Sequence, residues 1–222
     1  MSLTEKIAVS ISDGIKKTLK VDEEKEQIII YGAINLFQII FSILWVIIVG
    51  LFLGVLYEAL LFSFATAILR KYSGGGHASS PSRCIIIGTA LASIFAILVD
   101  KFFYQINKEY VIIVNIVFLV FAFIMIIKNA PVDSIKKPIT NIEIRKQFRK
   151  KAIIVITIYL IIIVILFMLN QKNAEIYYIK AIECIGFGVL CQTITLTKSG
   201  MSFINKVDFV LKYIINGGEN NE

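Results

Sequence analysis

The fold is decided by one long apolar stretch, IIIYGAINLFQIIFSILWVIIVGLFLGVLYEALLFSFATAIL, which runs from Ile28 to Leu69. Its only amide or charged side chains are those of Asn35, Gln38 and Glu58. As a single helix, its 42 residues would be roughly 63 Å long at about 1.5 Å per residue. That length is twice the ~30 Å hydrocarbon core of a bilayer. The stretch therefore predicts two membrane-crossing helices rather than one.

These two helices are expected at 28–49 and 53–69, joined by a tight turn at Gly50 or Gly54. Glycine suits such a turn because it adopts positive φ angles at no steric cost. The two glycines also form GxxxG, a pattern that favours close helix packing in membranes, but a turn accounts for both more simply. Glu58 is an ionisable group within the second helix, so it marks either a functional position or a side chain that reaches the membrane edge.

Four further apolar segments complete the pattern, at 84–99, 110–127, 152–169 and 176–197. Hydrophobic residues make up 57% of the 222 residues, and the mean hydropathy is +0.80. The usual apolar share of soluble domains is roughly 45–50%. The sequence therefore predicts an all-α polytopic membrane protein with six transmembrane helices, forming a single domain over residues 1–222.

The two ends of the chain are amphipathic rather than apolar. In residues 1–27 a large aliphatic residue recurs at every fourth position: Leu3, Ile7, Ile11, Ile15 and Leu19. This spacing places them on one helical stripe, which is typical of a helix lying at the membrane interface. A soluble leader helix packed on the domain is the alternative. A shorter amphipathic helix is expected at 203–215, within the polar tail.

The basic residues lie mainly between the apolar segments. In a six-span arrangement, the segments on one side of the membrane hold 19 Lys and Arg residues and those on the other side hold 3. This asymmetry places both termini and the loop between the second and third spans in the cytoplasm of a cell-membrane protein. The net charge of +7 is thereby explained by topology, so no nucleic-acid partner is expected. Lys180 and Glu183, three residues apart, are expected to pair on one helix face.

The polar loop that follows the first two spans is Arg70–Cys84, RKYSGGGHASSPSRC, and it holds the chain's only histidine, His77. A thiol seven residues from an imidazole suggests a nucleophile and its base. Cys84 would begin the third span, where the helix N-terminus and the adjacent Arg83 favour the thiolate. A lone interfacial cysteine that only packs is the alternative interpretation. Two other cysteines, Cys184 and Cys191, share a helix face and are expected to pack.

Several neighbours are expected to shape this loop. Gly74, Gly75 and Gly76 allow the chain to fold back and bring His77 over Cys84. Pro81 suits the entry into a helix, with Ser82 near the N-cap position. The backbone N–H of Cys84 is a candidate donor for an oxyanion hole. Three cysteines and one histidine offer neither a disulfide framework nor a zinc-ligand set, so no metal or other cofactor is expected.

The chain resembles the accessory gene regulator B family, AgrB-like membrane cysteine peptidases of peptide quorum sensing. The resemblance lies in the RKYSGGGHA loop, the His77–Cys84 spacing, the later motif NAPVD…KKPI at 129–139 and the six-span pattern with an amphipathic leader. It implies a cysteine endopeptidase that cleaves the C-terminal tail of an AgrD-like precursor peptide. Cys84 would form a thioester with the peptide, His77 would act as base and then as acid, and an internal thiol or hydroxyl would close a thiolactone or lactone.

The resemblance also implies a homodimer, and it suggests roles for residues outside the pair. Arg70 and Gly75 match the family loop and are expected to shape it. Lys136 and Lys137 are candidates to bind an acidic precursor tail, although juxtamembrane lysines more often set topology or contact anionic lipid.

Two functions of other classes remain open on the sequence alone. A small transporter or peptide-export channel would need paired charges along several spans and broken helices near the midplane. A non-enzymatic membrane scaffold would use the loop only to bind a partner. The fate of precursor maturation after Cys84→Ser separates a peptidase from a scaffold.

Overall fold

A computed structural model describes residues 23–133 and 139–215 of the chain. The interfacial helix expected at 1–27 lies outside these residues, apart from its last five positions. Lys136 and Lys137, the candidate contacts for a precursor tail, also lie outside them.

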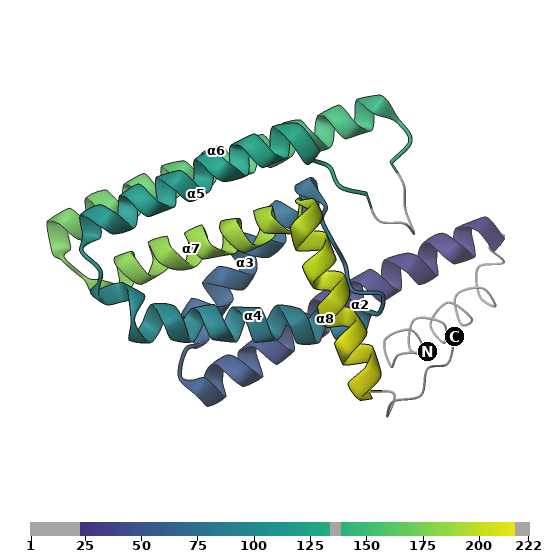
Figure 1. Ribbon diagram of the computed structural model, residues 1–222, viewed down its shortest axis with the longest axis horizontal. Coiled ribbons are helices and arrows are strands. Elements are labelled where there is room, and N and C mark those ends of the chain that lie inside the picture. Colours follow the sequence, from purple (N-terminus) through teal and green to yellow (C-terminus); the bar gives the residue numbers. More distant parts are fainter. Residues whose placement is uncertain (1–22, 134–138, 216–222) are drawn as a thin grey trace.

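The described part of the chain is helical, with seven α-helices in the order shown in Figure 1. They are α2 (Glu23–Leu53), α3 (Leu56–Ser73), α4 (Pro81–Lys101), α5 (Lys108–Asn129), α6 (Ile142–Asn173), α7 (Ile176–Ile194) and α8 (Lys198–Ile215), with a 3-10 turn η1 (Phe103–Gln105) after α4. The only β-type pairing among these residues is an isolated bridge between Gly74 and Val132. The expected all-α class is confirmed.

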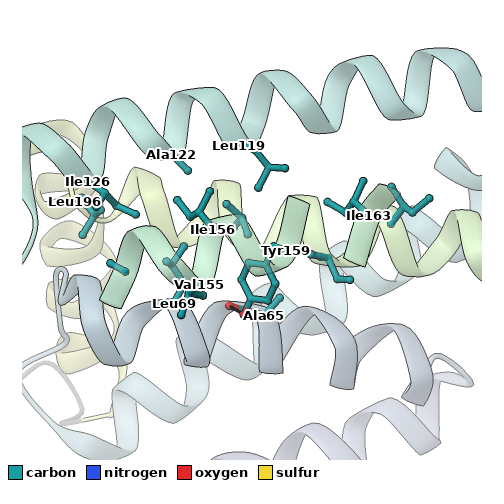
Figure 2. Close-up of a cluster of buried hydrophobic side chains, with 14 of the residues drawn as sticks. Ala65, Leu69, Leu119, Ala122, Ile126, Val155, Ile156, Tyr159, Ile163 and Leu196 are labelled. Atoms are coloured by element: carbon teal, nitrogen blue, oxygen red, sulfur yellow. Dashed lines mark hydrogen bonds between the residues drawn. The ribbon is translucent and has the colours of Figure 1, made fainter. Parts of the chain in front are cut away.

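Helix α7 is the centre of the bundle. It contacts α3, α4, α5 and α6, and in Figure 1 it lies between the α5–α6 pair and α4. One buried apolar cluster joins α3, α5, α6 and α7, and a second joins α2, α3, α4 and α7. Figure 2 shows the first cluster, where the Tyr159 hydroxyl of α6 donates a 2.9 Å hydrogen bond to the Ala65 carbonyl of α3. This bond satisfies the one polar group that Tyr159 brings into the cluster.

Four helical segments are long and apolar enough to cross a membrane: Gly32–Leu53, Pro81–Gln105, Lys108–Asn129 and Ile142–Asn173. A fifth crossing results if α7 and α8, which are bent by 90° at the break between them, are counted together. Helix α3 is less apolar because it contains Glu58, Arg70 and Lys71. These helices are consistent with a multi-pass membrane protein, but the predicted number of six spans is not confirmed.

The predicted segments nevertheless coincide with helices to within five residues, except that 152–169 lies inside the longer α6, which begins ten residues earlier at Ile142. The turn between the first two lies at Gly54, whose φ is +71°, whereas Gly50 remains inside α2. As a result α3 begins at Leu56, three residues after the predicted start. Helix α7 ends at Ile194, three residues before the predicted end, and α8 begins at Lys198, five residues before the predicted start of the terminal amphipathic helix.

A cluster of charges joins three helices near the end of the bundle where α4 stops. The Lys180 ammonium of α7 lies 3.2 Å from Glu58 Oε1 of α3 and 2.5 Å from Asp100 Oδ1 of α4. The expected pairing of Lys180 with Glu183 is therefore wrong. Glu183 faces a different, buried environment, where its Oε2 has no hydrogen-bond partner among the described residues.

The polar connections at the other end of the bundle meet one another. The Gly74–Val132 bridge joins the α3–α4 loop to the segment after α5. The Gly76 N–H donates to the Thr195 carbonyl (3.2 Å), in the turn between α7 and α8. Three segments that are far apart in the sequence thus assemble around the loop that contains His77.

Candidate active site

The loop needs glycine at two positions, because the backbone there has positive φ angles and because neighbouring atoms leave no room for a Cβ. Gly74 and Gly75 have φ angles of +67° and +134°, which side chains rarely adopt. A Cβ on Gly74 would overlap the Val132 carbonyl, and a Cβ on Gly75 would overlap the Thr195 hydroxyl. These contacts support the loop-shaping role expected of Gly75, because the chain can turn back here only without a side chain.

Two neighbouring segments fix the glycine turn through hydrogen bonds. The Gly75 N–H donates to the Val132 carbonyl (3.3 Å), and the Val132 N–H donates to the Ser73 carbonyl (3.0 Å). The buried Gln192 amide of α7 donates to Ser73 Oγ (3.0 Å) and to the Gly74 carbonyl (2.6 Å). The loop is consequently positioned by tertiary contacts rather than by its own sequence alone.

Two arginines of α6 hold the NAPVD motif in place beside the loop. Arg149 Nε donates to the Ala130 carbonyl (2.8 Å), and Arg145 donates to the Pro131 carbonyl (3.0 Å) and to Asp133 (2.5 Å). These arginines belong to the basic start of α6. They hold the segment that in turn pairs with Gly74 and Gly75, so part of the predicted basic segment has a structural function.

His77 contacts Arg70. Arg70 Nη2 lies 3.0 Å from His77 Nδ1 and also donates to the Gly76 carbonyl. Because a guanidinium can only donate, Nδ1 is the acceptor, and the neutral imidazole carries its proton on Nε2. Burial, together with the positive charge of Arg70, lowers the pKa of His77 from 6.5 to about 4. The residue as a whole remains exposed to solvent, so water screens part of both effects.

Cys84 lies in the first turn of α4. Pro81 is the first residue of this helix, as expected, but the N-cap is Ser80 rather than Ser82. The Cys84 N–H already donates to the Ser80 carbonyl (3.1 Å). The expected oxyanion-hole role of this N–H is therefore wrong for the described conformation. Cys84 is partly exposed, whereas Cys184 is buried in α7.

Arg70 is the common neighbour of the two residues that the sequence singles out. No hydrogen bond joins His77 to Cys84 in the described loop, where the imidazole contacts Arg70 instead. Burial lowers the pKa of Arg70, and a thiolate at the nearby Cys84 would offset part of this effect. Arg70 thus contacts both the Gly76 carbonyl and the His77 imidazole. The sequence indicated its charge only as one of several that favour the Cys84 thiolate, and it gave no sign of the contact with His77.

Asp208 of α8 is the residue of this region that sequence reasoning missed. It binds Ser79 and Arg83, which flank His77 and Cys84. It is the only acidic residue of α8, which also contains Lys198, Lys206 and Lys212. That isolation within a basic amphipathic helix is the one signal in the sequence that could have indicated it.

No three His, Cys, Asp or Glu side chains within residues 23–133 and 139–215 are grouped so that they could hold a metal ion. The chemistry available at the loop is that of a thiol, an imidazole and a guanidinium. This set can perform nucleophilic attack, proton transfer and stabilisation of a negative charge.

Comparison with known proteins identifies similar sequences. The sequence model of the family described as Accessory gene regulator B matches residues 8–196. An AgrB-like protein 2 of Clostridium perfringens (strain 13 / Type A) is 35% identical over 207 residues, covering 93% of this chain and 97% of that protein. An AgrB-like protein of Clostridium perfringens (strain SM101 / Type A) is 34% identical with the same coverage. No solved structure matches the chain.

Proposed function

Because the chain belongs to the accessory gene regulator B family, we propose that it is a membrane cysteine endopeptidase acting on an AgrD-like precursor peptide. Membership of the family assigns the chain to the processing of agr quorum-sensing peptides. The reaction that we propose is removal of the precursor's C-terminal tail, followed by cyclisation of the remaining peptide.

In the first step, the Cys84 sulfur attacks the carbonyl carbon at the cleavage site while the thiol proton passes to His77. The C–N bond then breaks, and His77 returns this proton to the leaving amine of the tail. The peptide remains on Cys84 as a thioester. His77 thus serves first as base and then as acid, and no proton is gained or lost overall.

In the second step, an internal thiol or hydroxyl of the bound peptide attacks the thioester carbonyl. A new thiolactone or lactone bond forms, the bond to the Cys84 sulfur breaks, and the proton of the attacking group restores the Cys84 thiol. Exchange of a thioester for a thiolactone retains the acyl activation, whereas water would hydrolyse it. A site that water reaches poorly therefore favours cyclisation over hydrolysis.

The observation that supports the proposal is that the clamped loop containing His77, whose imidazole is neutral, leads directly into the first turn of α4, which contains Cys84. A neutral imidazole can accept a proton, but its free lone pair is on Nδ1, which faces Arg70. Transfer from Cys84 therefore requires Nδ1 to leave Arg70. We expect the bound precursor to bring about this rearrangement, because its cleavage-site carbonyl offers Arg70 another acceptor.

The proposal includes the surroundings of the enzyme. The loop, both termini and the basic segment that contains Lys136 and Lys137 face the cytoplasm, where those lysines are candidate contacts for the precursor tail. The exposed apolar side chains in the middle of α2, among them Trp45 and Ile48, face lipid or a second copy of the chain in a homodimer.

The test is precursor processing in proteoliposomes that contain the full chain and a synthetic precursor with a central cysteine and an acidic tail. We expect Cys84→Ser and His77→Ala to abolish tail release, and the wild type to form a peptide thioester that hydroxylamine removes. Cys191→Ser is the matched control and should retain processing. Normal tail release by Cys84→Ser would overturn the role of Cys84, no release even by the wild type would indicate a non-enzymatic scaffold, and transport without cleavage would indicate an export channel.

A further inference from the structure

One carboxylate of α8 binds both sides of the candidate active-site loop. Asp208 Oδ2 accepts hydrogen bonds from the Ser79 N–H (3.1 Å) and the Ser79 hydroxyl (2.7 Å). Asp208 Oδ1 accepts from Arg83 Nε (2.6 Å), and Arg83 Nη2 also donates to the Ser79 hydroxyl. The three side chains form a closed ring of hydrogen bonds.

The positions of these partners in the sequence give the ring its significance. Ser79 follows His77 by two residues, and Arg83 immediately precedes Cys84. The loop segment that contains the imidazole and the helix turn that contains the thiol are thus tied to the same carboxylate. Any movement of one segment relative to the other must stretch a bond to Asp208.

The ring also differs from an ordinary surface ion pair. The side chains of Arg83 and Asp208 are each only 13% exposed. Exposed pairs contribute little to stability, whereas charge-assisted bonds that are shielded from water are stronger and more directional. Ile204 and Met201 of α8 pack beside Gly76 in the same loop, so α8 contacts the loop at more than one position.

We propose that Asp208 is a positioning residue for the His77–Cys84 pair, holding the two loop segments at a fixed separation through Ser79 and Arg83. The inference deepens the proposed function, on which its catalytic consequence rests. It makes α8, which contains no residue of the family loop motif, part of the apparatus of the active site.

An aspartate is required for this role because both of its oxygens accept. In Asp208→Asn one oxygen would be replaced by an NH₂ group, which would face the donors of either Ser79 or Arg83. The shape of the side chain would be retained while one side of the ring opened. Asp208→Glu retains both acceptors on a longer stem and should restore part of the lost function.

The first measurement is geometric and needs no substrate. In a chain with Cys184→Ala, Cys191→Ala and His77→Cys, a short bifunctional maleimide joins position 77 to Cys84. We expect Asp208→Asn to slow this cross-link by roughly tenfold, since small displacements of reacting groups have effects of this size. Lys212→Gln, an exposed change on the same helix, is the control and should leave the rate unchanged. Equal rates in the two variants would overturn the proposal.

The second measurement is processing of the synthetic precursor by the otherwise wild-type chain. We expect Asp208→Asn to lower kcat by roughly 10- to 100-fold with little change in KM, and Asp208→Glu to recover part of the loss. The double variant Arg83→Gln/Asp208→Asn should lose no more than the worse single variant, because both open the same ring. If the losses of the two single variants instead multiply in the double variant, Arg83 and Asp208 do not act through the same ring.

Failure of this inference and failure of the proposed function are distinguishable. If Cys84→Ser still processes the precursor, the proposed function fails whatever the cross-linking shows. If Cys84→Ser is inactive while Asp208→Asn cross-links and turns over normally, only the role of Asp208 is overturned. Should Asp208→Asn fail to insert in the membrane, Arg83→Gln, which removes a donor of the same ring, takes its place, and an unimpaired cross-linking rate together with wild-type kcat in Arg83→Gln contradicts the proposal.

Discussion

At the scale of single residues, the protonation of His77 follows from its contact with Arg70. Because His77 is the only histidine of the chain, its titration can be observed without interference. We expect the pKa of the imidazole to lie below 6.5, shifted toward 4 by burial and by Arg70, so that the imidazole is neutral at pH 7 and above. Histidine-labelled protein in micelles, followed by NMR through the pH-dependent shifts of the ring carbons, provides the measurement.

The direction in which Arg70 shifts the pKa of His77 provides a control for this prediction. A neighbouring positive charge disfavours the imidazolium, so Arg70→Gln should raise the pKa of His77 toward 6.5. Lys71→Gln removes an adjacent exposed cation that does not contact His77, and it should leave the titration unchanged. A wild-type midpoint near 6.5, or an Arg70→Gln midpoint no higher than that of the wild type, would contradict the arrangement of Arg70 and His77.

The arrangement of the side chains in the candidate active site could be predicted only in part from the sequence. Cys84 and His77 were identified by their chemical types and spacing, and Gly75 by the need for a tight turn. The contact of Nδ1 with Arg70 was not predictable, because it depends on how the glycines fold the chain back onto the end of α3. The same holds for the Cys84 N–H, whose partner Ser80 became the N-cap in place of Ser82.

At the scale of helices, the cluster around Lys180 fastens α7 to α3 and α4. Its side chains are shielded from solvent, with exposures of 12% for Lys180, 7% for Glu58 and 17% for Asp100. Lys180→Met would leave the buried Glu58 carboxylate without its cation, whereas Asp100 would keep Lys101, whose Nζ lies 2.8 Å from Asp100 Oδ2. Breaking a buried ion pair in this way typically costs roughly 3–5 kcal/mol, so we expect a markedly lower unfolding temperature in detergent.

A matched change on the same helix serves as the control for Lys180. Glu183→Gln alters a buried carboxyl group that takes no part in the cluster and whose Oε2 has no partner among the described residues. We expect it to leave the unfolding temperature unchanged or higher, because a neutral amide is less costly to bury than a carboxylate. If both variants unfold at the same temperature, the cluster does not fasten the three helices.

The helices themselves were largely predictable, whereas their contacts were not. Apolar length located most segments to within five residues, although α6 begins ten residues before the predicted start at 152, and the first turn lies at Gly54, one of the two candidate glycines. Spacing along α7 favoured a local pair between Lys180 and Glu183, but Glu58 and Asp100 reach Lys180 from other helices. Local spacing could not reveal such partners, because they lie 122 and 80 residues away in the sequence.

At the scale of the whole molecule, three segments that lie far apart in the sequence meet in one place. The glycine loop, the NAPVD segment and the turn after α7 assemble at one end of the bundle, with α8 crossing beside them (Figure 1). The resemblance to a family indicated that the first two belong together. It gave no indication of α8, since Arg83 and Asp208 are 125 residues apart and no pattern links them.

The arrangement of the whole chain in the membrane follows from whether α3 and α7 cross it, because these are the two helices that length and composition alone leave undecided. The 19-to-3 asymmetry of Lys and Arg predicts that both cross. The experiment labels single cysteines introduced into a cysteine-free chain. Phe52→Cys and Lys172→Cys should then react with an impermeant maleimide added outside intact cells. Lys71→Cys and Lys198→Cys should react only after permeabilisation. If Phe52 and Lys71 label from the same side, α3 does not cross, and if Lys172 and Lys198 do so, α7 does not. Because α7 ends against the active-site loop, labelling of Lys198 from outside would place His77 and Cys84 on the outer surface, where a newly made cytoplasmic precursor could not reach them.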